Sequence, residues 1–266
     1  MNILDRIVEH KKTEVARRKE ATGIDQLMRT NLFKRETFSL RESLLNESKT
    51  GIIAEFKRKS PSKGVINATA DVTEVTKAYT RFGASCLSVL TDEFFFGGNS
   101  DDLLKARVNN IPLLRKDFII DEYQVYEAKS IGADVILLIA ACLSPAQVKA
   151  LAKLATGLGM EVLLELHGEE ELEHICEETE IVGINNRNLK TFVVDIDRSL
   201  HMAERIPAGK IKVAESGISS VENILLFKEN GFKGFLIGEN FMKEPDPTFA
   251  FADFVEALQT SLKGGF

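Results

Sequence analysis

The alternation of β-rich and helical segments is the feature that most constrains the fold of this chain. Eight short apolar runs are each followed by a segment with helical spacing. The runs are 52–57 (IIAEFK), 86–90, 111–116, 134–140, 161–166, 181–185, 211–216 and 234–239. The helical segments are 71–82, 100–109, 121–131, 144–157, 169–178, 196–205, 218–230 and 247–262. A strand followed by a helix, repeated in this way, predicts a parallel sheet with crossover helices.

Two architectures can contain such a sheet, an open doubly wound sheet and a closed barrel. The first strand lacks a GxGxxG turn, and eight units is the number that closes a (β/α)8 barrel. We therefore predict an α/β fold, a (β/α)8 TIM barrel that forms a single domain over residues 1–266. Residues 1–48 show helical spacing, so we expect an N-terminal helical extension, with the barrel over 49–266.

Local signals mark several helix ends. The candidate N-caps are Asp71, Asp121, Ser144 and Ser219, and the candidate C-terminal glycines are Gly83, Gly132 and Gly231.

Composition excludes several classes of protein. The net charge of −6 argues against a general nucleic-acid binder, so any anionic ligand needs a local concentration of positive charge. The three cysteines, Cys86, Cys142 and Cys176, lack CxxC spacing, and we expect free buried thiols in a reducing compartment. We find no signal peptide and no run near the roughly 18 apolar residues of a membrane span. The expected location is the cytoplasm.

Polar side chains gather where the predicted strands end. Residues two apart on a strand point the same way, and catalytic groups of such barrels stand at the C-terminal ends of the strands. Five strands place a polar residue there in phase with an interior position: Glu55 and Lys57, Lys116 with Leu114, Glu165 with Leu163, Asn185 and Arg187, and Glu215 with Val213. Because interior charges need partners, we expect the pairs Lys57–Glu55 and Lys116–Glu165.

Glycines mark the ends of the last two predicted strands. Gly217 in AESGIS and Gly238 in LIGEN stand where strand becomes helix, and they leave backbone N–H groups accessible. The loops after strands seven and eight are the usual phosphate site of this fold. We therefore expect a phosphate at this side of the barrel mouth.

Taken together, nine segments identify the chain as similar to the indole-3-glycerol-phosphate synthase family. They are ILDRIVEHKKTEVARRK, IIAEFKRKSPSKG, SVLTDEFFFGG, LLRKDFIIDEYQ, GADVILLIA, LLELH, GINNRNL, VAESGI and LIGENFM. The resemblance covers nearly the whole chain. It implies a carboxy-lyase of tryptophan biosynthesis that closes the indole ring of 1-(2-carboxyphenylamino)-1-deoxyribulose 5-phosphate and releases carbon dioxide and water. It implies no cofactor and no metal.

The resemblance also implies roles for individual residues. Lys116 resembles the general acid of ring closure, and Glu165 resembles the general base of later steps. Lys57, with Glu55 nearby, resembles a lysine that contacts anionic groups and acts in dehydration. Asn185 and Arg187 resemble the pair that orients the carboxylate end. We expect burial or nearby cations to lower the pKa of a catalytic lysine, and burial to raise the pKa of a catalytic glutamate.

Other positions resemble the substrate-binding residues of the family. The lower wall and phosphate cradle correspond to Glu215, Ser216, Gly217, Gly238 and Glu239, and the apolar wall to Phe96, Phe118 and Leu137 or Leu138, with Ser60 near the substrate. Serine also occurs at the position of Glu239, so we expect its backbone N–H, and not its carboxylate, to meet the ligand. The chain has no tryptophan, so an aromatic contact that some relatives make from the N-terminal segment is replaced or missing.

Two other functions stay open from the residues alone. A sugar-phosphate isomerase such as phosphoribosylanthranilate isomerase would carry a Cys/Asp pair where this chain has Glu55 and Glu165. A silent barrel would bind a phosphorylated metabolite without turnover. Transient association with other enzymes of the tryptophan pathway stays open as well. We assign His167 a supporting or solvent-facing role, because His10, His167, His174 and His201 lack metal-ligand spacing.

Overall fold

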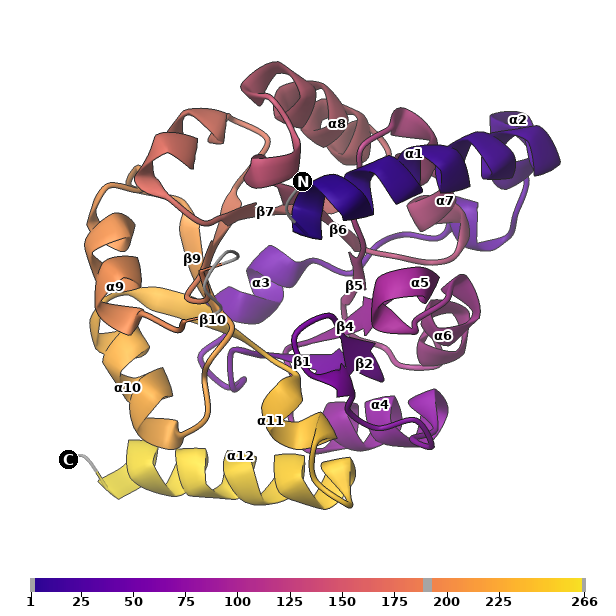
Figure 1. Ribbon diagram of the computed structural model, residues 1–266. Coiled ribbons are helices and arrows are strands. Elements are labelled where there is room, and N and C mark those ends of the chain that lie inside the picture. The colour runs from indigo at the N-terminus through magenta and orange to yellow at the C-terminus, as the bar shows by residue number, and fades with distance from the viewer. Residues whose placement is uncertain (1–2, 189–192, 265–266) are drawn as a thin grey trace.

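The computed structural model describes residues 3–188 and 193–264, which form a closed barrel of parallel strands surrounded by helices (Figure 1). The barrel strands are β1 (Ile52–Phe56), β4 (Cys86–Leu90), β5 (Leu113–Lys116), β6 (Val135–Ile139), β7 (Glu161–Leu166), β8 (Ile181–Asn185), β9 (Ile211–Glu215) and β10 (Phe232–Ile237). Each pairs with the next in sequence, and β1 closes the ring by pairing with β10. The predicted strands and the (β/α)8 architecture are confirmed.

The outer helices follow the strands as predicted, with additions. The crossover and C-terminal helices are α4 (Val72–Arg81), α6 (Ser100–Ala106), α7 (Glu122–Ser130), α8 (Pro145–Gly157), α9 (Ile196–Glu204), α10 (Val221–Glu229) and α12 (Pro247–Gly264). The N-terminal segment forms α1 (Ile3–Ala21), α2 (Ile24–Leu27), the 3-10 helix η1 (Leu32–Lys34) and α3 (Leu40–Leu45). Shorter pieces are the hairpin β2 (Lys59–Ser60) and β3 (Gly64–Val65), the helices α5 (Glu93–Phe96) and α11 (Glu239–Met242), and the 3-10 helices η2 (Ala140–Cys142) and η3 (Glu169–His174).

Two predicted helices differ from the structure. The expected helix 169–178 is only the 3-10 helix η3, because its acidic side chains repel one another and Gly168 offers no capping side chain. The expected helix 218–230 begins at Val221, and its N-cap is Ser220 instead of Ser219. The late start follows from left-handed backbone at Ser216 (φ 68°) and Gly217 (φ 71°), which continues the loop after β9.

The barrel separates two apolar cores. Strand residues of one parity pack inside it, among them Ile53, Leu114, Leu163 and Val213. Residues of the other parity pack against the outer helices, among them Phe56, Leu138 and Val182. The parity assigned from the sequence is therefore confirmed, and it directs the polar strand ends toward the barrel axis.

The N-terminal segment closes both ends of the barrel. At the N-terminal ends of the strands, Leu40 and Leu44 of α3 join the interior core, and Ser43 Oγ of α3 donates to the carbonyl of Ser85 at 2.6 Å. At the opposite end α1 crosses the barrel mouth, and its Ile7 is buried in the interior core (Figure 1). Helix α1 thus covers one side of the barrel mouth.

A buried ion cluster fixes α1 to the barrel. Lys11 is fully buried, and its Nζ lies 2.9 Å from Asp92 Oδ2, 2.9 Å from Asp117 Oδ1 and 3.0 Å from Glu14 Oε2. Asp92 caps α5, and Asp117 follows β5 directly. Lys11 therefore joins α1 to two loops of the mouth.

The structure also bears on more general expectations. No helix among the described residues is long and apolar enough to cross a membrane. The three cysteines are free, with Cys86 buried and Cys142 and Cys176 partly buried. The single-domain organisation and the boundary at residue 49 stay predictions.

Candidate active site

A pocket of about 270 Å³ opens at the C-terminal ends of the barrel strands. Every residue that the sequence assigned to the site lines it: Glu55, Lys57, Ser60, Phe96, Lys116, Phe118, Leu137, Glu165, Asn185, Arg187, Glu215, Ser216, Gly217, Gly238 and Glu239. Segments that are distant in the sequence meet here because parallel strands of a closed barrel end on one rim.

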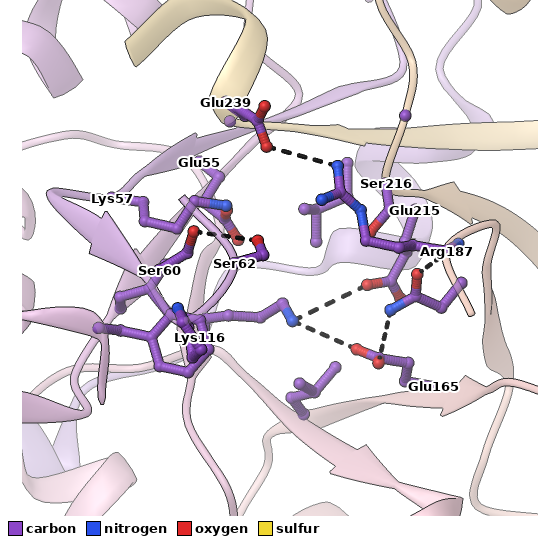
Figure 2. A pocket seen from close by; sticks show the side chains of 18 of the residues that line it. Glu55, Lys57, Ser60, Ser62, Lys116, Glu165, Arg187, Glu215, Ser216 and Glu239 are labelled. Carbon is purple, nitrogen blue, oxygen red and sulfur yellow. Dashed lines mark hydrogen bonds and ion pairs between the residues drawn. The ribbon is translucent and has the colours of Figure 1, made fainter. Parts of the chain in front are cut away.

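Lys116 lies at the centre of the polar groups (Figure 2). Its Nζ donates to Glu165 Oε2 at 3.2 Å and lies 4.0 Å from Glu215 Oε2. Asn185 Nδ2 donates to the other oxygen of Glu165 at 3.0 Å. Lys57 Nζ donates to Glu55 Oε1 at 2.7 Å, so both predicted lysine–glutamate pairs are present.

The charges of the central pair run opposite to our expectation. Burial alone lowers the pKa of Lys116, but the carboxylates of Glu165, Glu215 and Glu55 outweigh it and raise the pKa above its ordinary value. Burial alone raises the pKa of Glu165, but Lys116, His167 and Asn185 outweigh it and hold the pKa well below its ordinary value. In the folded protein Lys116 is therefore a buried ammonium and Glu165 a buried carboxylate, because the attraction between nearby opposite charges outweighs the effect of burial on both pKa values.

The pKa of Glu215 is shifted in the direction opposite to that of Glu165. Burial raises the pKa of Glu215 well above its ordinary value, and the neighbouring carboxylate of Glu165 raises it further. Its Oε1 has no hydrogen-bond partner among the described residues and lies against Gly183, where a Cβ would collide with it. Gly183 thus leaves the space that Glu215 fills, and a proton on Glu215 avoids a second buried negative charge beside the carboxylate of Glu165.

The rim of the pocket beside the loop after β10 carries two cations and a carboxylate. Arg187 Nη2 lies 3.4 Å from Glu239 Oε2 (Figure 2). Lys63 Nζ from the β2–β3 turn lies 3.5 Å from Glu239 Oε1. The Glu239 carboxylate therefore reaches across the rim, although we expected only its backbone to face the ligand. Ser216 is the single non-glycine residue with positive φ among the described residues, and Asn186 Nδ2 holds its carbonyl at 2.7 Å. Such strained backbone typically occurs at ligand sites.

Four positively charged residues follow β1, and two of them lie at the pocket while two pair with other parts of the protein. They are Lys57, Arg58, Lys59 and Lys63. Lys57 and Lys63 face the pocket or its rim, but Arg58 pairs with Asp102 and Lys59 Nζ donates to the carbonyl of Phe94 at 2.6 Å. Arg58 and Lys59 are therefore engaged in contacts away from the pocket, and only Lys57 and Lys63 remain available to a ligand.

An apolar wall faces these polar groups. The rings of Phe96 and Phe118 lie 5.9 Å apart between centroids, and Leu137 points inward whereas Leu138 points to the outer helices. Helix α1 adds Ile3, Leu4 and Ile7 to the lining. Aliphatic side chains of the N-terminal segment thus line the pocket.

Lys11 escaped the sequence analysis, whereas His167 was expected to have a supporting or solvent-facing role and has the supporting one. Lys11 shares the buried stripe of α1 with Ile7 and Val15, at i+4 from Ile7, and this spacing was the available signal. His167 lines the pocket with Nε2 2.9 Å from Glu165 Oε1, so it contacts a predicted catalytic residue directly. Its position two residues after Glu165 on the same strand parity would have indicated this contact. His174, by contrast, has both ring nitrogens near backbone carbonyls, at 3.0 and 2.9 Å.

Comparisons with known proteins agree with the geometry. A family profile described as indole-3-glycerol phosphate synthase matches residues 4–254. A relative of that name from Bacteroides thetaiotaomicron is 47% identical over 259 residues, which are 97% of this chain and 99% of the relative. Another of that name from Chromobacterium violaceum is 51% identical over 201 residues, covering 75% of this chain and 76% of the relative. A solved structure of tryptophan synthase subunit alpha from Legionella pneumophila covers 85% of this chain and 98% of its own with a TM-score of 0.62, and at 13% identity it indicates the fold alone. This chain belongs to the indole-3-glycerol phosphate synthase family.

Proposed function

We propose that this chain performs the reaction of its family, the conversion of 1-(2-carboxyphenylamino)-1-deoxyribulose 5-phosphate to indole-3-glycerol phosphate, carbon dioxide and water. The observation that carries the proposal is the position of Lys116 Nζ, 3.2 Å from Glu165 and 4.0 Å from Glu215, between an apolar wall and a cationic rim. A proton donor, a proton acceptor and a place for each end of the substrate thus share one pocket.

Ring closure needs a proton on the ribulose carbonyl oxygen as the aromatic carbon attacks the carbonyl carbon. We assign this proton to Lys116, whose raised pKa keeps it charged before the reaction. The alkoxide that forms is a stronger base than a lysine amine, so the proton still moves from nitrogen to oxygen. A donor held in place for this step contributes roughly 10² to 10⁴ in rate.

The later steps restore and extend the aromatic system. The carboxylate leaves as carbon dioxide, and its bonding electrons return to the ring. The new hydroxyl then leaves as water with a proton, which we assign to Lys57, paired with Glu55 at 2.7 Å. The adjacent carbon loses a proton to Glu165, whose lowered pKa makes it an anion at neutral pH and whose carboxylate is oriented by Asn185.

The two ends of the substrate have separate places in this proposal. The anthranilate ring lies against Phe96, Phe118 and Leu137. The phosphate lies beside Arg187 and the loops of Gly217 and Gly238. We assign Arg187 to the phosphate because its contact with Glu239 holds it at that side of the rim, although the resemblance assigned it to the carboxylate end. Ser60, Glu215 and Ser216 complete the lining.

Every step moves a proton or releases carbon dioxide or water, so the side chains supply the chemistry that the proposal needs. We further propose that the protein acts in the cytoplasm. Transient association with other tryptophan-pathway enzymes belongs to the same proposal, and co-purification of those enzymes with the chain would test it.

Fluorescence tests the reaction directly. The chain has no tryptophan, so the indole product provides an emission that the protein lacks. We expect emission to rise when the wild-type protein meets the carboxyphenylamino-deoxyribulose phosphate. Lys116→Met should lower kcat by roughly 10² to 10⁴ without abolishing binding, because a general acid is lost. The same change at exposed Lys153 on α8 is the control. Binding of the substrate without any indole emission would contradict the proposal and favour a silent barrel.

A further inference from the structure

Asn186 lies beside the loop that follows β9, one residue beyond the end of β8. It is fully buried, and it is not among the residues that line the pocket, although its neighbours Asn185 and Arg187 are. Its side-chain Nδ2 donates to the backbone carbonyl of Ser216 at 2.7 Å. Since Ser216 does line the pocket, a buried amide outside the pocket holds a part of the pocket wall.

The backbone of Asn186 is fixed on both sides. Its N–H donates to the carbonyl of Glu215 at 2.8 Å, which continues the pairing of β8 with β9. Its carbonyl accepts from the N–H of Asp195 at 2.9 Å, and Asp195 is the N-cap of α9. The barrel and α9 therefore set the place from which the side-chain amide reaches Ser216.

The side chain of Asn186 has no second task among the described residues. Its Oδ1 is buried without a hydrogen-bond partner there, and the hydrogen bond from Nδ2 to Ser216 is the single one that the side chain makes to them. Buried polar atoms are ordinarily paired, so an amide that leaves one atom unpaired needs a reason. The reason that the structure offers is the hold on Ser216.

The loop at Ser216 needs such a restraint. Ser216 has φ 68°, a left-handed conformation that is unfavourable for a residue with a Cβ. Gly217 follows with φ 71°, and a Cβ there would collide with the side chain of Val194. The loop therefore keeps a strained residue beside a position that excludes a side chain.

This conformation directs a peptide N–H toward the pocket. The carbonyl and the N–H of a trans peptide point to opposite sides. Because the carbonyl of Ser216 points to Asn186, the N–H of Gly217 in the same peptide points away from Asn186. Gly217 lines the pocket, and its N–H donates to no described residue. Unused N–H groups in turns of this kind bind anions.

We propose that Asn186 is a positioning residue for phosphate binding. Its amide holds back the carbonyl of Ser216 and thereby presents the N–H of Gly217 to the substrate phosphate, although Asn186 itself does not touch the substrate. Without the amide, Ser216 relaxes to more favourable backbone angles, and the peptide that carries this N–H turns. The inference rests on the proposed function, in which the phosphate lies beside Gly217 and Gly238.

The decisive variant is Asn186→Leu, which keeps the size of the side chain and removes the donor. Since Oδ1 has no partner among the described residues, only the carbonyl of Ser216 loses a hydrogen bond. We expect KM to rise by roughly three- to tenfold, which is the worth of one hydrogen bond. The value of kcat should not change, because the phosphate is bound equally before and during the reaction. Asn186→Ala, which leaves room in the buried space, should give the same pattern.

Binding of two separate probes locates the effect. The affinity for inorganic phosphate, measured by phosphorus NMR, should fall in Asn186→Leu by a factor similar to the rise in KM. The affinity for anthranilate, followed by its own fluorescence, should stay unchanged, because the proposed place of its ring is the apolar wall. A loss of general stability would not separate the two probes.

Two further variants test the route of the effect. Asn109→Leu is the matched control, because Asn109 is buried outside the pocket and its Nδ2 donates to the carbonyl of Ala106 at 2.8 Å. It should lower stability without changing KM or the affinity for phosphate. The rise in KM should also persist when Asn186→Leu is combined with Arg187→Gln, since it passes through the N–H of Gly217 and not through the guanidinium.

The outcomes separate this role from the reaction. Wild-type phosphate affinity in Asn186→Leu, or equal losses for phosphate and anthranilate, would overturn the positioning role. A rise in KM that disappears in the Arg187→Gln background would overturn it as well, and so would a wild type that does not bind phosphate. Neither probe requires turnover. A wild type that binds both probes but forms no indole would therefore overturn the proposed function alone.

Discussion

Removal of the Lys11 ammonium should lower the free energy of unfolding by more than removal of a single exposed charge would. In Lys11→Met the methionine fills the buried space, but three carboxylates lose a cation. Glu14 keeps Arg18 at 2.6 Å and Asp117 keeps Arg115 at 3.1 Å, whereas Asp92 keeps no other cation among residues 3–188 and 193–264. One carboxylate is thus left buried and unpaired.

Breaking a buried ion pair from one side costs about 3–5 kcal/mol. Since two of the three partners retain a cation, we expect the lower end, about 3 kcal/mol of unfolding free energy. In a chain of this size that corresponds to a melting temperature lower by about 6–12 °C. Denaturant titration followed by circular dichroism measures the loss, and Lys12→Met, at an exposed lysine one residue away, is the matched control.

The pH dependence gives a second test. Burial alone raises the pKa of Asp117, but Lys11 and Arg115 outweigh it and lower the pKa, so this carboxylate stabilises the fold above its ordinary pKa and loses that effect in acid. The pKa of Lys11 is raised by Asp117, Asp92 and Glu14 against the opposing effect of burial, so its stabilisation persists through neutral pH and is lost only at high pH. The deficit of Lys11→Met should therefore be largest near neutral pH and shrink below about pH 4. A deficit under 1 kcal/mol at pH 7, or one equal to that of Lys12→Met, would refute the reasoning.

Three further changes probe the pocket. Glu239→Gln should lower KM by about two- to fivefold with little change in kcat, because the carboxylate no longer competes with the substrate phosphate for Arg187 and Lys63. The control is Glu244→Gln, at an exposed glutamate. An unchanged or higher KM in Glu239→Gln, or the same decrease in the control, would argue against this competition. Gly183→Ala should lower kcat by up to about a hundredfold, because the new Cβ displaces the Glu215 carboxyl. The control is Gly157→Ala on α8, where a Cβ meets nothing within 4 Å and kcat should stay unchanged. Equal kinetics of the two variants would count against the steric argument. Glu215→Gln should stabilise the fold at pH 7 but not at pH 3. Because the pKa of Glu215 is raised, the folded state keeps a proton that the unfolded chain releases above about pH 4.3, and this difference favours unfolding at pH 7. Glutamine carries no such proton and removes the difference. Denaturation midpoints at the two pH values measure this, with exposed Glu256→Gln as control, and a uniform effect at both would contradict a protonated Glu215.

The strand parity explains why so much of the site could be predicted. Glu55, Lys116, Glu165 and Glu215 each end a strand in phase with interior residues, and a closed parallel barrel brings such positions to one rim. The contacts of Lys11 with Asp92 and Asp117 could not be predicted in this way, because they join α1 to loops that are distant in the sequence. The same holds for the approach of Glu239 to Arg187 and Lys63.

Local sequence alone determined the eight strands, most of their helices and the side of each strand that faces the barrel axis, because these depend on period and on neighbours along the chain. The tertiary structure decided the charges of the site. The pKa of Lys116 is raised and that of Glu165 is lowered by partners from other strands, whereas Glu215 has its pKa raised in the same pocket. Burial and opposite charge act against each other on a pKa, and only the distances between side chains determine which of them prevails.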